Sequence, residues 1–423
     1  GGRQPFTHIW HKLITEWIKR DRNRPSIILW SLGNELQIRE GWAGFEGTND
    51  WGITTYNIFN QLVKRWDHTR LTTVAMFPAR AGAITRHDKE FNDYLVPPEL
   101  ACATEVASFN YQSDKYDAYL KYQPDLILFQ SEAETSNLLQ PYYNMDRKRT
   151  VGMAYWGSAE YWGESNKWPK KGWNYSFFDH TMRPYPQAYL IKSAFMPEVP
   201  EVHIGVVDAA GMESISWNDV IVGRMVLNEC WNHIPGSRQS LFTFTNAHSV
   251  ELLVNGQSMG VQQNDTTQAN LRNMIYWKDV PYGNGGSVVA IARDKSGKEV
   301  ARHRIETAGK AVALRIEAET PTDWKADGMD LQYINVTAID KKGRPVWDYN
   351  EPLTLQMEGA AQLVALDNGD HYTDELFHGI TSKRMYQGRM QIILRSTKIP
   401  SNVKLKISSA DLKEKLSLKT SLK

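Results

Sequence analysis

The chain has 423 residues, of which 41 % are hydrophobic and 23 % charged, and 49 basic residues against 48 acidic ones give a net charge of +1. This composition is typical of a folded protein, and the length predicts two to four domains at roughly 100–200 residues each. Nothing in the charge balance suggests a polyanionic partner, and no Lys/Arg tract suggests nucleic acid or a charged membrane surface. No apolar run approaches the roughly 18 residues of a membrane-spanning helix. Because the chain begins Gly1-Gly2 and enters a helical pattern at once, we expect its natural N-terminus to be missing.

The first 197 residues alternate helical and strand patterns. Trp10, Ile14 and Trp17 recur at helical spacing, and the apolar run at 26–32 is typical of a buried parallel strand. Further helices are predicted at 56–66 and 116–122, and further strands at 71–76, 105–111, 126–131 and 150–156. Strands that alternate with helices predict a parallel α/β sheet. Five strands are too few to close an eight-stranded barrel.

From residue 201 onward, short alternating strands dominate the sequence. They are predicted at 240–245, 249–254, 274–277, 287–292, 331–339 and 390–394. Turn signals such as Asn255-Gly256 and Asn368-Gly369 separate the strands, and this pattern is typical of β-sandwiches. The segment 307–310 is a plausible seam between two of them.

Two predicted strands of the first half end in a glutamate. The strand that finishes Gly33-Asn34 leads into Glu35, and the strand 126–131 leads into Glu132. In a parallel α/β barrel the C-terminal strand ends carry the active site, so two such carboxylates can face each other, as glycoside hydrolysis requires. A structural glutamate beside a turn is the competing interpretation. Glu134 is a second candidate nucleophile, but Glu132 follows the strand directly and is favoured.

At this point the sequence resembles a known family. The segment from Arg20 to Glu35 is similar to the acid/base signature of glycoside hydrolase family 2, which includes β-galactosidases, β-glucuronidases and β-mannosidases. It departs from the family at Arg24, where a histidine is frequent. Ser131-Glu132 resembles the nucleophile strand, Asn110-Tyr111 the family's Asn-Tyr on the sixth barrel strand, and 155–157 part of the eighth-strand segment.

The resemblance implies a role for each matching residue. Glu35 would be the general acid/base and Glu132 the nucleophile, with the Tyr111 hydroxyl in contact with the nucleophile. Asn34 would bind the sugar 2-hydroxyl. The residues implied in substrate binding are Asn34, Asn110, Tyr111 and Trp156, the last lining the sugar pocket.

The resemblance also implies the domain organisation. Segments such as 249–260 and 367–370 resemble the immunoglobulin-like modules that follow the barrel in bacterial members. We therefore expect the C-terminal portion of a (β/α)8 TIM barrel at 1–197, followed by immunoglobulin-like β-sandwiches at 198–309 and 310–423. The N-terminal domains and the first three barrel strands would be absent.

The implied function is that of a retaining exo-β-glycosidase that works through a covalent glycosyl-enzyme. A β-galactosidase is the first expectation, and β-glucuronidase and β-mannosidase are alternatives within the family. Glucuronidases carry an Asn-x-Lys that grips the substrate carboxylate, but here Pro169 stands where the Asn should precede Lys171. A non-catalytic carbohydrate-binding or scaffolding protein is the alternative of another class. With an incomplete barrel, the chain alone is expected to be inactive.

The sequence and the resemblance also give expectations for cofactors, partners and location. The sequence requires no cofactor, and its histidines show no metal-ligand spacing such as pairs at i and i+4, although the resemblance leaves room for Mg²⁺ near the acid/base. The expected partner is an oligo- or polysaccharide, with no nucleic acid and no membrane, and a homo-oligomer is left open. A bacterial periplasmic or secreted location is implied by the resemblance alone.

Overall fold

The computed structural model describes residues 6–35, 52–77, 97–133, 139–165, 168–217 and 220–422. The chain divides into two compact units. The barrel unit comprises 1–156 and 214–224, and the sandwich unit comprises 157–213 and 225–423. In the described part of the chain, no helix combines the length and the apolar character needed to cross a membrane. The division into domains at 197/198 and 309/310 stays a prediction.

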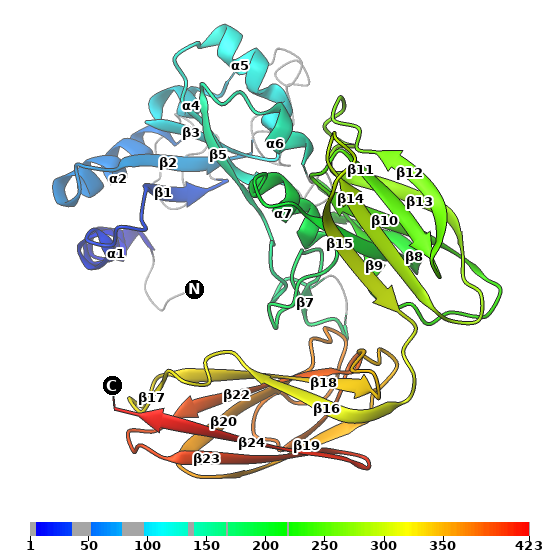
Figure 1. Ribbon diagram of the computed structural model, residues 1–423. Helices are drawn as coiled ribbons and strands as arrows, with labels where there is room; N and C mark the ends of the chain where they lie inside the picture. Colours follow the sequence, from blue (N-terminus) through cyan, green and yellow to red (C-terminus); the bar gives the residue numbers. More distant parts are fainter. Residues whose placement is uncertain are drawn as a thin grey trace. The chain divides into compact units, whose positions relative to one another are not determined.

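The barrel unit is built on one five-stranded sheet in the order β1-β2-β3-β4-β5, and every neighbouring pair is parallel. Its strands are β1 (Leu29–Asn34), β2 (Leu71–Met76), β3 (Val106–Asn110), β4 (Leu128–Ala133) and β5 (Thr150–Tyr155). Helices lie against this sheet in Figure 1. The predicted parallel α/β architecture is therefore confirmed.

The described helical segments of the barrel unit are α1 (Phe6–Asp21), α2 (Ile53–Trp66), α4 (Glu99–Ala103), η2 (Ser113–Lys115), α5 (Tyr116–Tyr122) and α6 (Gln140–Asn144). All of them except η2 and α6 bury apolar side chains. In α1, Ile14 and Ile18 are buried at helical spacing, and Trp17 meets the buried Trp30 of β1 edge-on at 5.0 Å between ring centroids. This packing fixes β1, the strand that leads into Glu35.

The first sandwich, which belongs to the sandwich unit except for 214–224, has two four-stranded sheets, β13-β10-β8-β9 and β12-β11-β14-β15. The strands are β8 (Val202–Trp217), β9 (Val220–Asn228), β10 (Arg238–Thr245), β11 (Ser249–Val254), β12 (Gln257–Gln263), β13 (Met274–Pro281), β14 (Ser287–Arg293) and β15 (Glu299–Glu306). Alternate residues of β8, β11, β13 and β14 enter one core, which includes Trp231 and Trp277. The strands predicted at 240–245, 249–254, 274–277 and 287–292 are confirmed.

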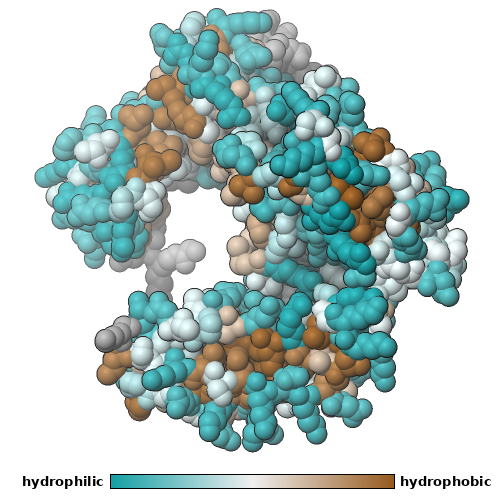
Figure 2. Space-filling model, in the orientation of Figure 1, coloured by the Kyte–Doolittle hydropathy of each residue, from teal (hydrophilic) through white to brown (hydrophobic). Residues whose placement is uncertain are grey.

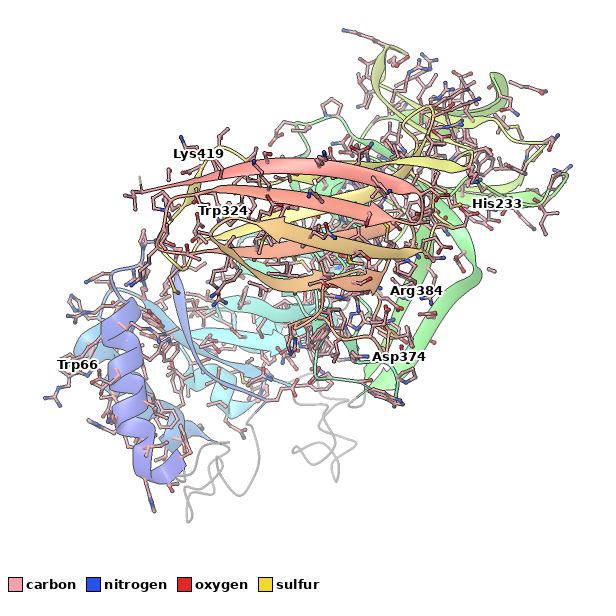
Figure 3. All side chains as sticks on the ribbon, turned by 90° about the horizontal axis from the view of Figure 1, so that it is seen from below. Trp66, His233, Trp324, Asp374, Arg384 and Lys419 are labelled. Atoms are coloured by element: carbon pink, nitrogen blue, oxygen red, sulfur yellow. The ribbon has the colours of Figure 1, made fainter. Side chains whose placement is uncertain are left out.

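The second sandwich packs the sheet β16-β18-β22-β20 against β17-β24-β23-β19-β21. Its strands are β16 (Ala311–Ala318), β17 (Trp324–Lys325), β18 (Leu331–Asp340), β19 (Pro352–Glu358), β20 (Ala361–Asp367), β21 (Ser382–Arg384), β22 (Arg389–Ser396), β23 (Asn402–Ser409) and β24 (Leu412–Ser421). Trp324 is buried among these strands (Figure 3). An apolar band runs along the side of this sandwich in the space-filling view (Figure 2).

The segment that precedes the first sandwich is largely irregular. It contains β6 (Tyr161–Trp162), β7 (Gly172–Trp173) and α7 (Ala188–Phe195), and it belongs to the sandwich unit. The backbone N–H of Lys171 donates to the carbonyl of His371, which lies after β20. Parts of the chain that are far apart in sequence are therefore joined within this unit. The two cysteines, Cys102 and Cys230, are not bonded to each other.

Candidate active site

The C-terminal end of β1 presents Glu35 through an irregular strand end. β1 pairs with β2 in regular parallel register up to Ser31, and the register then shifts before Asn34 pairs with Ala75. Glu35 has a φ of 54°, and its backbone N–H donates to the Ala75 carbonyl at 2.7 Å. A left-handed backbone is uncommon for a glutamate, and such outliers cluster at functional sites.

A second irregular strand end lies at β3. Its register with β4 shifts between Phe109 and Asn110, so that Asn110 pairs with Glu132. Tyr111 follows with a φ of 59°, and its backbone N–H donates to the Glu132 carbonyl at 2.8 Å. The same edge of the sheet therefore carries Glu35, Tyr111 and Glu132.

Asn110 joins the ends of β1, β3 and β4 through its side-chain amide. This buried residue donates from Nδ2 to Asn34 Oδ1 at 3.1 Å and to Glu35 Oε1 at 3.0 Å. Its Oδ1 accepts a hydrogen bond from Ser131 Oγ at 2.7 Å. Because Nδ2 faces two acceptor oxygens and Oδ1 faces a hydroxyl, the orientation of the amide is defined by its surroundings.

The Tyr111 side chain forms a hydrogen bond with the carboxylate of Glu132. Its hydroxyl donates to Glu132 Oε2 at 2.5 Å, and its ring packs edge-on against Phe77 with 5.6 Å between centroids. Hydrogen bonds to ionised acceptors are short and strong, so this contact orients the Glu132 carboxylate. Since Asn110 and Tyr111 are consecutive, one short stretch of backbone positions both glutamates.

Trp156 follows β5 at the same edge of the sheet. Its backbone N–H donates to the carbonyl of Ala133, the residue after Glu132, at 3.0 Å, and its side chain is partly buried. Of the six residues singled out from the sequence, five are therefore linked through hydrogen bonds of Asn110 and Tyr111, and Trp156 lies beside the end of β4. Their catalytic and binding roles stay predictions, and Glu134 lies outside the described residues.

Ser131 is a member of this network that the sequence did not predict as a site residue. An ideal strand would place Ser131 and Glu132 on opposite faces of the sheet. The register of β4 with β5 shifts between Gln130 and Ala133, and this irregularity brings both side chains to the network. In the sequence, the position of Ser131 directly before Glu132 was the one indication that Ser131 lies near the site.

The Mg²⁺ ion that the resemblance left open does not fit the described residues of this edge. Magnesium requires a nearly octahedral set of oxygen ligands. The side-chain oxygens of Asn34 and Glu35 instead face the same NH2 group of Asn110, which is a donor and cannot bind a cation.

Comparison with known families supplies an independent view. The model described as "Glycosyl hydrolases family 2, TIM barrel domain" matches residues 5–156, and "Glycoside hydrolase family 2 C-terminal domain 5" matches residues 314–416. The chain belongs to glycoside hydrolase family 2. A third model, described as "Domain of unknown function (DUF4982)", matches residues 236–301. The predicted architecture of a partial TIM barrel followed by sheet-rich domains is confirmed for this family 2 chain.

The chain also matches individual proteins of the family, and it covers only part of each of them. It is 24 % identical to the β-galactosidase BoGH2A of Bacteroides ovatus over 96 % of its own length and 51 % of that protein. A solved family 2 member from Bacteroides cellulosilyticus matches with a TM-score of 0.79 and 25 % identity, over 99 % of this chain and 52 % of that one. A solved family 2 β-glucuronidase matches in fold with a TM-score of 0.71 at 17 % identity, over 99 % and 41 %. The chain thus spans about half the length of these relatives.

Proposed function

We propose that this family 2 chain carries both catalytic carboxylates of a retaining exo-β-glycosidase that removes terminal β-linked sugars, with β-galactosides as the first substrate class. The observation that supports this proposal is the hydrogen-bond network of Asn110 and Tyr111, which ties Glu35 and Glu132 to one edge of a parallel sheet. Glycosidases act through such a pair of carboxylates on either side of the scissile bond.

In the proposed reaction, Glu35 and Glu132 divide two displacement steps. Glu132 attacks the anomeric carbon while Glu35 protonates the departing glycosidic oxygen, so the C1–O bond breaks and an ester bond to Glu132 forms. Glu35, now a carboxylate, removes a proton from water, and the water oxygen displaces Glu132 from C1. Two inversions give retention of configuration.

The neighbouring residues act on these groups in distinct ways. Tyr111 orients the Glu132 carboxylate through its hydroxyl, and Asn110 fixes the positions of Asn34 and Glu35. Asn34 is exposed at the strand end and is proposed to bind the sugar 2-hydroxyl, a contact that strengthens in the transition state. Trp156 is proposed to offer its apolar ring to the sugar.

We favour galactosides over glucuronides because of the sequence around Lys171. Glucuronidases of the family resemble one another in an Asn-x-Lys that grips the substrate carboxylate, and here Pro169 stands in place of that asparagine. The Lys171 ammonium donates to the carbonyl of Thr373 within the sandwich unit. The curated relatives include both activities by name, a β-galactosidase and a putative β-glucuronidase of Formosa agariphila, so the sugar must be tested directly.

A panel of nitrophenyl β-glycosides tests the substrate class. We expect a polypeptide that carries this chain and the rest of its barrel to hydrolyse the β-galactoside with a higher kcat/KM than the β-glucuronide or the β-mannoside. A preference for the glucuronide would overturn the choice of sugar. Binding of sugars without turnover of any would favour the non-catalytic alternative.

The 423-residue chain by itself is expected to show little turnover. The described sheet has five strands, and β1 and β5 each pair with a single neighbour in it, whereas a closed family barrel needs eight strands. Rapid hydrolysis of an aryl β-galactoside by the purified chain would contradict this expectation. A periplasmic or secreted location stays a proposal that rests on the family resemblance.

A further inference from the structure

A buried group of ionisable side chains lies in the sandwich unit, separate from the carboxylate pair. Its members are Glu160, His180 and His371, whose side chains are 1 %, 7 % and 3 % exposed. Glu160 and His180 precede α7, whereas His371 follows β20 of the second sandwich. The group therefore joins two segments that are far apart in the sequence.

The three side chains converge on one point. Glu160 Oε2 lies 2.9 Å from His371 Nε2 and 3.5 Å from His180 Nδ1, and one potential ligand atom from each residue lies within 4.8 Å of the others. Zinc bound tetrahedrally at about 2.0–2.2 Å keeps neighbouring donor atoms roughly 3.3 Å apart. The distances of 2.9 Å and 3.5 Å differ from about 3.3 Å by only a few tenths of an ångström, so small shifts of the side chains would give the spacing of zinc ligands.

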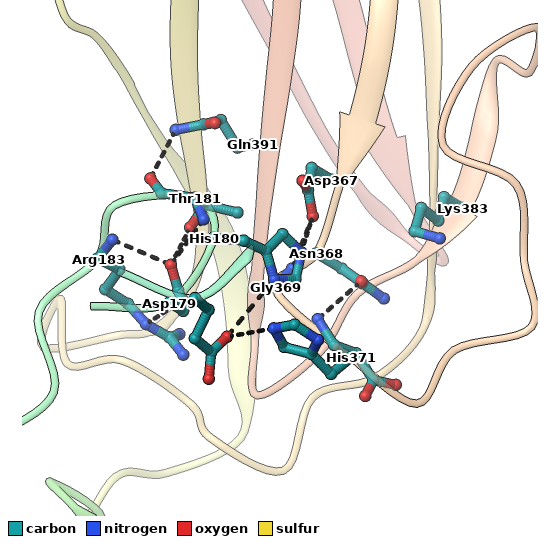
Figure 4. Close-up of polar contacts among 12 residues, drawn as sticks. Asp179, His180, Thr181, Arg183, Asp367, Asn368, Gly369, His371, Lys383 and Gln391 are labelled. Carbon is teal, nitrogen blue, oxygen red and sulfur yellow. Dashed lines mark hydrogen bonds and ion pairs between the residues drawn. The ribbon is translucent and has the colours of Figure 1, made fainter. Parts of the chain in front are cut away.

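The outer atoms of the group are already hydrogen-bonded. His180 Nε2 and Asp367 Oδ1 are 2.9 Å apart, and the Tyr185 hydroxyl donates to Glu160 Oε1 at 2.9 Å. Figure 4 shows His180 between Asp367 and His371. A neutral His180 that donates from Nε2 keeps a lone pair on Nδ1, the nitrogen that faces Glu160. Metal-binding histidines typically have such a carboxylate partner, which fixes the tautomer and the ring orientation.

The inner histidine nitrogens lack the hydrogen bonds that burial normally demands. Across the described ranges, neither His180 Nδ1 nor His371 Nε2, the two nitrogens that face Glu160, has a hydrogen-bond partner of acceptable geometry. His371 Nδ1 has none either, but it would not be a ligand atom in this arrangement. The contacts of His180 Nδ1 and His371 Nε2 with Glu160 are close in distance only. Since buried polar atoms are rarely left unsatisfied, these nitrogens indicate a missing ligand that accepts lone pairs.

A second group with the same residue types provides a contrast. His203 Nε2 and Glu229 Oε1 form a hydrogen bond of 2.7 Å, and His303 Nδ1 accepts one from the backbone N–H of Ile204 at 3.1 Å. A neutral His303 that accepts at Nδ1 carries its proton on Nε2, the nitrogen that lies 4.0 Å from Glu229. His303 Nε2 therefore has no lone pair with which to bind a metal ion. The contacts of this second group are accounted for by hydrogen bonds within the protein.

We propose that Glu160, His180 and His371 bind a divalent transition-metal ion, zinc in the first instance, which fastens the segment before α7 to the second sandwich. Two imidazoles and one carboxylate suit zinc, and they leave a fourth position for water. The rings of Trp162 and Phe377 lie 5.8 Å and 6.2 Å from the His180 ring and give the site an apolar wall. Because the ion would close a long loop of chain, its binding would stabilise the fold.

Without metal, the same residues would form an ion-pair network. Burial alone would lower the pKa of His180, but the hydrogen bond with Asp367 and the negative charges of Asp367 and Glu160 outweigh it and raise the pKa to about 9. A protonated His180 could then satisfy both carboxylates. The two arrangements differ in a measurable way, since only one of them binds zinc.

Metal binding is tested on the whole 423-residue chain after dialysis against a chelator. We expect one zinc ion per chain at micromolar concentration, an increase in melting temperature on adding zinc, and, with cobalt, the visible absorption of a tetrahedral site. Asp367→Asn is expected to weaken zinc binding by about 10- to 100-fold, because Asp367 orients His180. His371→Ala is expected to abolish it.

The control is His303→Ala in the second group, which should leave one zinc ion per chain. Absence of zinc binding by the unaltered chain would overturn the proposal, whatever the folding of the variants. Loss of zinc in His303→Ala, with retention in Asp367→Asn and His371→Ala, would place the ion elsewhere and overturn it as well.

Discussion

Glu132→Gln is expected to lower kcat on an aryl β-galactoside by roughly 10⁴-fold or more in the polypeptide that carries the complete barrel, with little change in melting temperature. The amide has nearly the shape of the carboxylate but cannot form the ester bond to C1. The side chain is only partly buried at the end of β4, so the fold loses little. Hydrolysis at near the original rate would contradict the assignment of the nucleophile.

Azide separates the role of Glu132 from that of Glu35. In Glu132→Ala, azide can enter the vacated space and attack C1 directly, which gives an α-glycosyl azide by a single inversion. In Glu35→Ala, a substrate with a good leaving group still forms the glycosyl-enzyme, and azide then displaces Glu132 to give a β-glycosyl azide. The anomeric configuration of each product, read by NMR, reports the role. Products of the opposite configuration would exchange the two assignments.

Glu134 supplies the matched control for this experiment. It stands two residues beyond Glu132 and was the second candidate nucleophile in the sequence. We expect Glu134→Gln to retain kcat within a few-fold, since a substitution outside the reacting atoms removes no bond-forming group. A loss as large as that of Glu132→Gln, together with azide rescue of Glu134→Ala, would move the nucleophile to this residue.

The strands of the barrel unit were largely predictable because their apolar runs are continuous and their partners are parallel. The strand at 71–76 and the helix at 116–122 have the predicted bounds. The strand predicted at 26–32 begins three residues later, and Ile28 is 84 % exposed. The Arg70 side chain donates hydrogen bonds to the backbone carbonyls of Arg24 and Ile27. The backbone of this stretch is therefore hydrogen-bonded by a side chain and not by a neighbouring strand. Hydropathy alone carries no information on such a contact.

The site was predictable in its residues and unpredictable in its geometry. A glutamate that ends a buried strand is visible in the sequence, but the positive φ values of Glu35 and Tyr111 arise where strands distant in sequence pair out of regular register. Neither residue is the glycine or asparagine that usually signals such a backbone. The group of Glu160, His180 and His371 was missed for a related reason, because its ligand atoms come from distant segments and show no local spacing.

Asp67→Ala is expected to destabilise the barrel unit by about 3 kcal/mol, because it breaks a buried ion pair and leaves its partners unsatisfied. Asp67 follows α2, and its side chain is 3 % exposed. Its Oδ2 accepts hydrogen bonds from Trp30 Nε1 at 2.9 Å and Arg70 at 2.7 Å, and its Oδ1 accepts two from Thr69. The substitution removes the hydrogen-bond acceptor of the Trp30 side chain on β1 and that of the Arg70 side chain. Denaturant unfolding measures the loss.

The dependence of this loss on pH identifies the charge as its source. Burial opposes ionisation of Asp67, but hydrogen bonds from Thr69, Trp30 and Arg70 outweigh it and hold the pKa of the carboxyl well below its usual range. A lowered pKa in the folded state gives stability that is present above the unfolded-state pKa of about 3.9 and is lost as the pH falls towards the folded-state value. The gap in unfolding free energy between the unaltered chain and Asp67→Asn should therefore narrow below about pH 4.

Asp125 provides the comparison that separates a buried carboxylate from an exposed one. It lies 3.6 Å from Arg149, and its side chain is 87 % exposed. An ion pair in water contributes about 0–1 kcal/mol, so Asp125→Asn should leave the unfolding free energy almost unchanged at every pH. A gap for Asp67→Asn that stays constant from pH 7 to pH 3 would show that shape, and not ionisation, makes Asp67 important for the strand that carries Glu35.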